Sequence, residues 1–212
     1  MKINYSLYLV TDKGLAGKRP VVSIVEKAIK GGVTIVQYRE KNAPTGEMIE
    51  EAQNIHNVTL KAGIPLIIDD RTDVALAVGA EGVHIGQSDM PADLVRKTIG
   101  LKKILGVTAG SVKEAVKAEK DGADYLGISD IFGSSTKTDT GGAVGVEMIR
   151  QIRKAVRIPI VGIGGITLEN AGWVIAAGAD GIAVISAIFS AKKPEVAAKN
   201  LRSVADHFKE IN

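Results

Sequence analysis

Eight short runs rich in aliphatic and β-branched residues recur along this chain of 212 residues, and segments with helical periodicity separate most of them. The runs are, in order, LYLVTD from Leu7, TIVQYRE from Thr34, PLIIDD from Pro65, GVHIGQ from Gly82, ILGVTA from Ile104, YLGISDIF from Tyr125, PIVGIGGI from Pro159 and GIAVISAI from Gly181. Strands that alternate with helices are typical of parallel pairing. Because eight units of about 26 residues match a small (β/α)8 barrel, we predict that residues 1–212 form one α/β domain with the TIM-barrel fold.

The main alternative is an open, doubly wound parallel sheet. That fold more often has five or six strands, and its glycine-rich phosphate-binding turn follows the first strand directly. Here the segment after the first run, TDKGLAGKRP, lacks the G-x-G-x-x-G pattern. The barrel is therefore favoured, and it predicts that functional groups lie at the carboxyl ends of the strands.

The composition narrows the class of protein. Hydrophobic residues make up 45% of the chain, which is enough for one large core. The formal charge is only +3 and aromatic residues are 4%, which argues against a nucleic-acid partner. There is no cysteine, so disulfides and thiolate metal sites are excluded. The chain shows neither an apolar signal core nor a stretch near the roughly 20 residues that span a bilayer. We predict a cytoplasmic protein with no membrane partner, and whether it forms a homo-oligomer stays open.

Polar residues end nearly every predicted strand, and the cations among them indicate an anion site. Gln37, Arg39 and Lys41 share one face of the second strand, whereas Glu40 faces the other way. Two cations in a closed core would be prohibitively costly. Arg39, Lys41 and, from the loop after the sixth strand, Lys137 would converge on one rim, where their charges suit a diphosphate. The alternative is a solvated rim in which these cations pair with Glu40 and Asp139.

Two carboxylates end neighbouring strands, Asp70 after the third and Asp89 after the fourth. Carboxylates a few ångströms apart repel unless a proton or a cation lies between them, and Mg²⁺ is typically held by one or two carboxylates plus substrate phosphates. We therefore predict a Mg²⁺ site at Asp70 and Asp89, with helix capping as the alternative. Asp69, the neighbour of Asp70 on the same strand, is predicted to point to the opposite face.

A second anion site is predicted on the same rim. The loops after strands seven and eight of this fold commonly bind a phosphate monoester through backbone N–H groups and a helix N-terminus. In the VGIGGI run, Gly164 and Gly165 permit close backbone approach, although a glycine pair can also form a tight turn. The SSTK loop, residues 134–137, adds hydroxyl donors to the same region.

The three histidines form no metal-binding or catalytic-triad pattern. His84 lies within the fourth run and points either into the barrel or towards a helix, and a structural role is favoured for it. His56 and His207 lie on predicted helices, where we expect them to be exposed to solvent.

The ordered motifs VQYREK, DDRTDVA, GVHIGQSDM, STKTD, VGIGGI and GIAVISAI resemble those of the thiamin-phosphate synthase family, also called thiamin-phosphate pyrophosphorylase, over nearly the whole chain. The resemblance implies a Mg²⁺-dependent transferase on a (β/α)8 barrel. It would condense 4-amino-2-methyl-5-(diphosphooxymethyl)pyrimidine with a thiazole phosphate and release thiamin phosphate and pyrophosphate. It further implies that Arg39, Lys41 and Lys137 are catalytic, that Gln37, Arg39, Lys41, Asp69, Thr108 and Lys137 bind the pyrimidine diphosphate, that Asp70 and Asp89 bind Mg²⁺, and that Ser134, Ser135, Thr136, Gly165, Ile185 and Ser186 bind the thiazole phosphate.

The chain departs from the family pattern at three places. It has Asp69 where the family usually has Asn, Thr108-Ala109-Gly110 where the family often has Ser-x-His, and Asp130 in place of a proline. One alternative is a thiazole tautomerase, a similar barrel that needs the phosphate monoester site but not the diphosphate site, and the retained cations and carboxylates argue against it. A sugar-phosphate isomerase would need a Glu or His base at a strand end, and a non-enzymatic phosphate sensor would need no metal pair.

Overall fold

A closed ring of eight parallel strands forms the centre of the computed structural model, which describes residues 3–133 and 143–210. The strands pair in sequence order, and β8 pairs with β1 to close the ring. They are β1 (Leu7–Val10), β2 (Ile35–Tyr38), β3 (Leu66–Asp69), β4 (Gly82–Ile85), β5 (Ile104–Ala109), β6 (Tyr125–Ile128), β7 (Ile160–Ile163) and β8 (Gly181–Val184). The predicted (β/α)8 barrel is confirmed.

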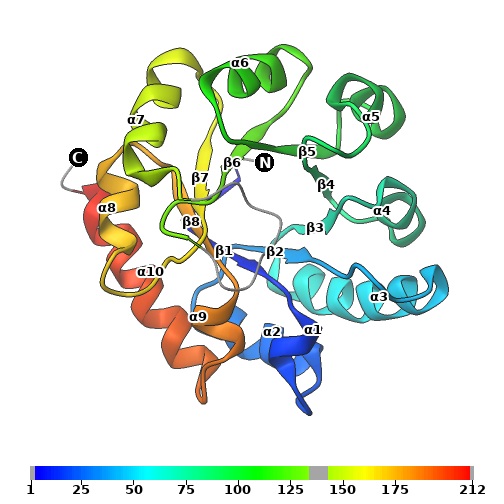
Figure 1. Cartoon of the computed structure of the whole chain (residues 1–212). Coiled ribbons are helices and arrows are strands. Elements are labelled where there is room, and N and C mark those ends of the chain that lie inside the picture. The colour runs from blue at the N-terminus through cyan, green and yellow to red at the C-terminus, as the bar shows by residue number, and fades with distance from the viewer. Residues whose placement is uncertain (1–2, 134–142, 211–212) are drawn as a thin grey trace.

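Helices surround the ring, as Figure 1 shows. The longer ones are α2 (Val21–Lys30), α3 (Thr45–Ala62), α4 (Thr72–Val78), α5 (Ala92–Ile99), α6 (Val112–Lys120), α7 (Gly145–Ala155), α8 (Ala171–Ala176) and α10 (Pro194–Glu210). Two single turns, α1 (Lys13–Ala16) and α9 (Ser186–Phe189), follow β1 and β8.

Strand side chains alternate between the two sides of the sheet. Leu7 and Leu9 of β1 point outward, into the apolar layer that the helices cover. Tyr8 and Val10 point inward and pack with residues of six other strands and with Tyr5. Because side chains fill the interior of an eight-stranded barrel, this inner cluster is a packed core. A ligand site is therefore expected beyond it, at the carboxyl ends of the strands.

A recurring hydrogen bond ties the strands together in pairs. The residue directly before each even-numbered strand uses its side chain to accept a hydrogen bond from a backbone N–H near the start of the preceding strand. The four bonds are Leu7 N to Thr34 Oγ1 (3.2 Å), Leu66 N to Glu81 Oε2 (2.8 Å), Leu105 N to Asp124 Oδ2 (2.7 Å) and Ile160 N to Asp180 Oδ2 (2.8 Å). In each case a glycine with positive φ lies two residues earlier, at Gly32, Gly79, Gly122 and Gly178. The barrel is thus built from four similar strand pairs.

His56 lies inside the protein, so the prediction that it is exposed is wrong. It is 5% exposed, its Nδ1 is 3.1 Å from the carbonyl oxygen of Val78, and its Nε2 is 3.1 Å from Glu81 Oε1. Because Glu81 also accepts the Leu66 N–H, it joins α3 to the base of β3. His207 on α10 is exposed as predicted.

Within the described residues, none of the helices combines the length and apolar character needed to cross a membrane.

Candidate active site

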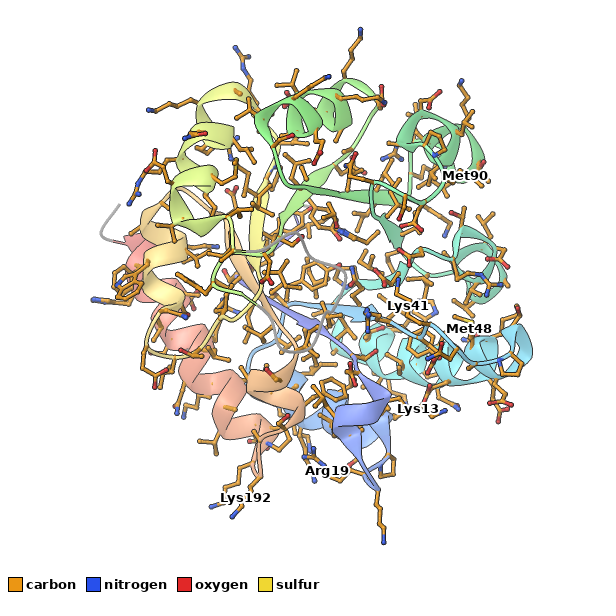
Figure 2. The ribbon with its side chains drawn as sticks, viewed as in Figure 1. Lys13, Arg19, Lys41, Met48, Met90 and Lys192 are labelled. Carbon is orange, nitrogen blue, oxygen red and sulfur yellow. The ribbon has the colours of Figure 1, made fainter. Side chains whose placement is uncertain are left out.

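Two cations and three carboxylates meet at the carboxyl ends of β1, β2 and β3. The Arg39 guanidinium lies 3.8 Å from Asp12 Oδ2 and 3.7 Å from Asp69 Oδ2. The Lys41 ammonium lies 3.4 Å from Asp69 Oδ2 and also pairs with Asp70. Burial lowers the pKa of Lys41, but Asp69 and Asp70 outweigh it and leave the pKa raised, so the side chain stays charged. Figure 2 labels Lys41 on the side of the barrel that carries α3 and α4.

The strand alternation predicted for this region holds along β2. Gln37 is 5% exposed and points into the barrel, where its amide donates to the Tyr8 hydroxyl. Tyr38 points outward to α3, where its hydroxyl donates to Glu51. Glu40 accepts hydrogen bonds from the backbone N–H groups of Asn42 and Ala43 in the turn that follows it. It makes no ion pair with the cation cluster, Arg39 and Lys41. Arg39 and Lys41 therefore pair with Asp12, Asp69 and Asp70 and not with Glu40, while Asp139, the other predicted partner, lies outside the described residues.

Asp69 and Asp70 do not point to opposite faces, so that prediction is wrong. β3 ends at Asp69, and Asp70 has a φ of 58°, in the left-handed region that residues other than glycine seldom adopt. The turn breaks the two-residue period of the strand, and both carboxylates reach Lys41.

Asp70 and Asp89 lie in contact, as predicted for a metal site. Burial and the adjacent Asp89 carboxylate raise the pKa of Asp70, although Lys41 acts in the opposite direction. Helix capping is excluded as their role, because neither α4 nor α5 has a side-chain cap. Asp89 instead accepts the Gly86 N–H at 2.7 Å, which closes the loop after β4.

The charge and the donor set of this rim suit a divalent cation. Two cations, Arg39 and Lys41, lie among four carboxylates, those of Asp12, Asp69, Asp70 and Asp89, which leaves an excess of negative charge. The described part of the chain holds no group of three or more metal-ligating side chains. Two carboxylates with open positions around them match Mg²⁺ sites that are completed by water and substrate phosphate.

The second anion region is predicted in the loops after β7 and β8, and Gly133 of the segment after β6 lies beside them. Gly164 and Gly165 have φ values of 106° and 63°. A Cβ on Gly165 would lie 2.4 Å from the carbonyl oxygen of Gly133, so the packing of the loops against each other already requires glycine there. Ile185 precedes α9, and Ser186 begins it, which leaves the first N–H groups of that turn without intrahelical acceptors. Ser134, Ser135, Thr136 and Lys137 lie outside the described residues.

A buried polar chain, which the sequence did not indicate, lies directly below the cation cluster. It consists of Gln37, Tyr8, Tyr125, His84 and Thr108. The Tyr8 and Tyr125 hydroxyls are 2.7 Å apart, His84 Nδ1 is 2.9 Å from the Tyr125 hydroxyl, and His84 Nε2 is 2.8 Å from Thr108 Oγ1. His84 thus points into the barrel, and Thr108, a predicted substrate contact, ends the chain. The alternation of β1, β2, β4, β5 and β6 places these residues inside, but sequence alone did not show which side chains meet across the barrel.

Comparison with known proteins identifies the family of this chain. Residues 7–188 match the family model for thiamine monophosphate synthase. A thiamine-phosphate synthase from Chloroflexus aurantiacus is 52% identical over 202 residues, which cover 95% of this chain and 93% of the relative. Another, from Moorella thermoacetica, is 51% identical over 200 residues, with coverage of 94% and 95%. The solved structure of a thiamine phosphate pyrophosphorylase from Pyrococcus furiosus is 40% identical and has a TM-score of 0.88, with 97% of both chains covered. The chain therefore belongs to the thiamine monophosphate synthase family, as its motifs predicted.

Proposed function

We propose that this protein condenses 4-amino-2-methyl-5-(diphosphooxymethyl)pyrimidine with a thiazole phosphate to give thiamin phosphate and pyrophosphate. One observation carries the proposal, within a chain of this family. Arg39 pairs with Asp69, Lys41 pairs with Asp69 and Asp70, and Asp70 lies beside Asp89, all at adjacent strand ends. A thiazole tautomerase has no diphosphate to bind, so it would have no use for this combination of cations and carboxylates.

The cation cluster, Arg39 and Lys41, would bind the diphosphate. In the protein alone, Asp12, Asp69 and Asp70 hold both cations in place. A diphosphate carries more charge than one carboxylate and can accept two parallel bonds from a guanidinium, so it would displace these pairs. We assign Lys137 to the same diphosphate from the loop after β6.

Asp70 and Asp89 would hold Mg²⁺. When bound, the ion would neutralise charge on the diphosphate and so make pyrophosphate a better leaving group. The raised pKa of Asp70 supports the assignment, because burial and the adjacent Asp89 carboxylate disfavour its charged form and a bound cation would offset both effects.

The reaction itself is a displacement at the methylene carbon. The bond between that carbon and the diphosphate oxygen breaks, and its electron pair leaves with pyrophosphate. The electron-rich aminopyrimidine ring stabilises the resulting cation, and the lone pair of the thiazole nitrogen then forms the new C–N bond. Arg39, Lys41 and Lys137 stabilise the charge that grows on the leaving group, a contribution often worth several kcal/mol per well-placed donor. No general base is needed.

The thiazole phosphate would bind on the opposite side of the rim. Gly165, Ile185 and Ser186 would contact it, largely through backbone N–H groups after β7 and at the start of α9. Ser134, Ser135 and Thr136 would add hydroxyl donors. With its phosphate anchored there, the thiazole nitrogen is held in line with the methylene carbon.

Pyrophosphate release by the purified protein tests this function. We expect release only when both substrates and Mg²⁺ are present, and thiamin phosphate should form in equal amount. Omission of either substrate or of Mg²⁺ should abolish it. Isomerisation of a thiazole carboxylate phosphate without the pyrimidine substrate, together with no pyrophosphate release, would instead identify a tautomerase.

A further inference from the structure

With the Gln37 amide nitrogen towards Tyr8, one direction of hydrogen bonding satisfies all members of the buried polar chain. The Gln37 amide nitrogen donates to the Tyr8 hydroxyl at 3.1 Å, and the other partner of that hydroxyl among the described residues is Tyr125. The single Tyr8 hydrogen is therefore satisfied only towards Tyr125, whose own hydrogen goes to His84 Nδ1. This direction requires a neutral His84 ring with its proton on Nε2, which donates to Thr108 Oγ1. The hydroxyl hydrogen of Thr108 then remains available to a ligand.

The barrel is shaped around this chain. A Cβ on Gly106 would lie 2.2 Å from Tyr125 Cζ and 2.4 Å from His84 Nδ1, and a Cβ on Gly127 would lie 3.0 Å from His84 Cε1. Glycine at these two positions thus leaves the room in which the His84 imidazole and the Tyr125 phenol contact each other. Burial raises the pKa of both Tyr8 and Tyr125, so both hydroxyls keep their protons and remain donors.

All five members of the chain line one small cavity. Gln37 and Thr108 line it together with Val10 and Ile163, at the carboxyl end of the barrel interior. Arg39 directly follows the end of β2, two residues after Gln37, so the cavity and the diphosphate-binding cations share this end of the barrel. A substrate whose diphosphate binds Arg39 and Lys41 would place its ring near this cavity. An amide is well suited to such a ring, because its carbonyl and N–H groups match an amino group beside a ring nitrogen.

We propose that His84 is a positioning residue for substrate recognition, which acts through Tyr125 and Tyr8 to keep the Gln37 amide in one orientation. This inference rests on the proposed function. The Gln37 nitrogen faces Tyr8, so its carbonyl oxygen is left to accept from the amino group of the pyrimidine ring. If the Tyr125 oxygen is removed, the Tyr8 hydrogen finds an acceptor only when the amide turns over and offers its oxygen to Tyr8. The amide then presents a donor to the amino group, and recognition is lost.

The tautomer of His84 tests the first half of this inference without any activity measurement. The three histidines can be resolved by ¹⁵N NMR of imidazole-labelled protein, and the spectrum of His84→Asn assigns the His84 signals. We expect a neutral ring protonated at Nε2 in the unsubstituted protein. A ring protonated at Nδ1, or at both nitrogens, would overturn the inference. If His84→Asn fails to fold, His56→Asn and His207→Asn assign the other two rings and leave the third set of signals to His84.

Discrimination between substrates tests the second half. We expect Tyr125→Phe to lower the preference for the natural pyrimidine diphosphate over its analogue without the amino group by about tenfold, which corresponds to one lost hydrogen bond. KM for the thiazole phosphate should not change. Tyr5→Phe is the matched control, because Tyr5 packs on the same ring at a centroid distance of 5.1 Å but takes no part in the chain.

The two hypotheses fail in different ways. If the unsubstituted protein releases no pyrophosphate, the proposed function fails, while NMR still decides the direction of the chain. If the protein is active but Tyr125→Phe discriminates as well as Tyr5→Phe, the positioning role of His84 is wrong and the function stands.

Discussion

Arg39 and Lys41, at the carboxyl end of the barrel, are held by ion pairs with aspartates. A bound anion would replace those aspartates as the partner of each cation. Arg39 contacts Asp12 and Asp69 at 3.8 and 3.7 Å, which are ion-pair distances too long for direct hydrogen bonds. Such pairs restrain the guanidinium but leave it able to turn to a stronger acceptor. Asp69 contacts both Arg39 and Lys41, so under the proposed function it would compete with the diphosphate for them.

The first prediction concerns Arg39 and Lys41. Arg39→Ala and Lys41→Ala should each lower kcat/KM for the pyrimidine diphosphate by roughly 2–4 kcal/mol of transition-state stabilisation, because charge on the leaving group loses a donor. KM for the thiazole phosphate should stay nearly constant. Lys113→Ala, an exposed cation on α6, is the control for a change in overall charge. Steady-state kinetics with each substrate varied in turn would check this, and normal activity in both variants would remove the cation cluster from the mechanism.

At the scale of elements, the strand pairs are joined by side chains that bond across the base of the barrel. Asp124 accepts the Leu105 N–H at 2.7 Å, and Arg96 pairs with Asp124 at 2.6 Å while also donating to the Gly122 carbonyl. Asp180 and Arg153 repeat this arrangement at β7 and β8. These contacts lie at the end of the barrel opposite to the site, where residues serve stability.

The second prediction separates these contacts from catalysis. Asp124→Ala should lower the free energy of unfolding by about 1–2 kcal/mol, since the Leu105 N–H loses its partner, whereas Asp124→Asn, which keeps an acceptor oxygen, should cost less. Neither should change kcat. Urea denaturation and steady-state rates of the two variants would test it. Equal stability in the alanine variant and the original protein would show that the bond contributes nothing measurable.

The order of the strands made much of the site predictable. Once eight alternating units indicate a barrel, the residues at the strand ends must share one rim, which correctly brings Arg39, Lys41, Asp70 and Asp89 together. The predicted opposite directions of Asp69 and Asp70 were wrong, because the positive φ of Asp70 alone sets where its side chain points. Prediction also failed where partners are distant in sequence. His56 and Glu81 are 25 residues apart, and Tyr8 and Tyr125 are 117 apart, so no local pattern reveals that they meet.

At the scale of the whole molecule, the last helix completes the outer layer of helices around the strands. α10 packs on α2 and α8, so it covers the seam where β8 meets β1. Gly31, just after α2, makes this approach possible, because a Cβ there would lie 2.3 Å from the carbonyl oxygen of Glu195 and 2.7 Å from Ala198 Cβ. Its own backbone is right-handed helical, with φ −79°, so packing rather than conformation requires the glycine.

The third prediction contrasts two glycine substitutions that should change the stability of the fold in opposite directions. Gly31→Ala should destabilise the fold by about 1–3 kcal/mol, since the added methyl group pushes α10 away from α2. Gly46→Ala in α3, where no atom lies within 4 Å of an added Cβ, should stabilise it by up to about 1 kcal/mol through helix propensity. Thermal unfolding of both variants measures the contrast. A Gly31→Ala protein as stable as the original would mean that the seam tolerates an outward shift of α10.

The central claim is that Asp70 and Asp89 form a Mg²⁺ site which binds diphosphate together with Arg39 and Lys41. Calorimetric titration of pyrophosphate in Mg²⁺ and in EDTA tests it most directly, with Asp70→Asn and Asp69→Asn compared. We predict tight binding only with Mg²⁺ in the original protein and loss of that dependence in Asp70→Asn. In Asp69→Asn the dependence should persist, with equal or tighter binding, because a competing carboxylate is gone. Equal affinity in Mg²⁺ and EDTA for the original protein, or loss of the dependence in Asp69→Asn but not in Asp70→Asn, would contradict the claim.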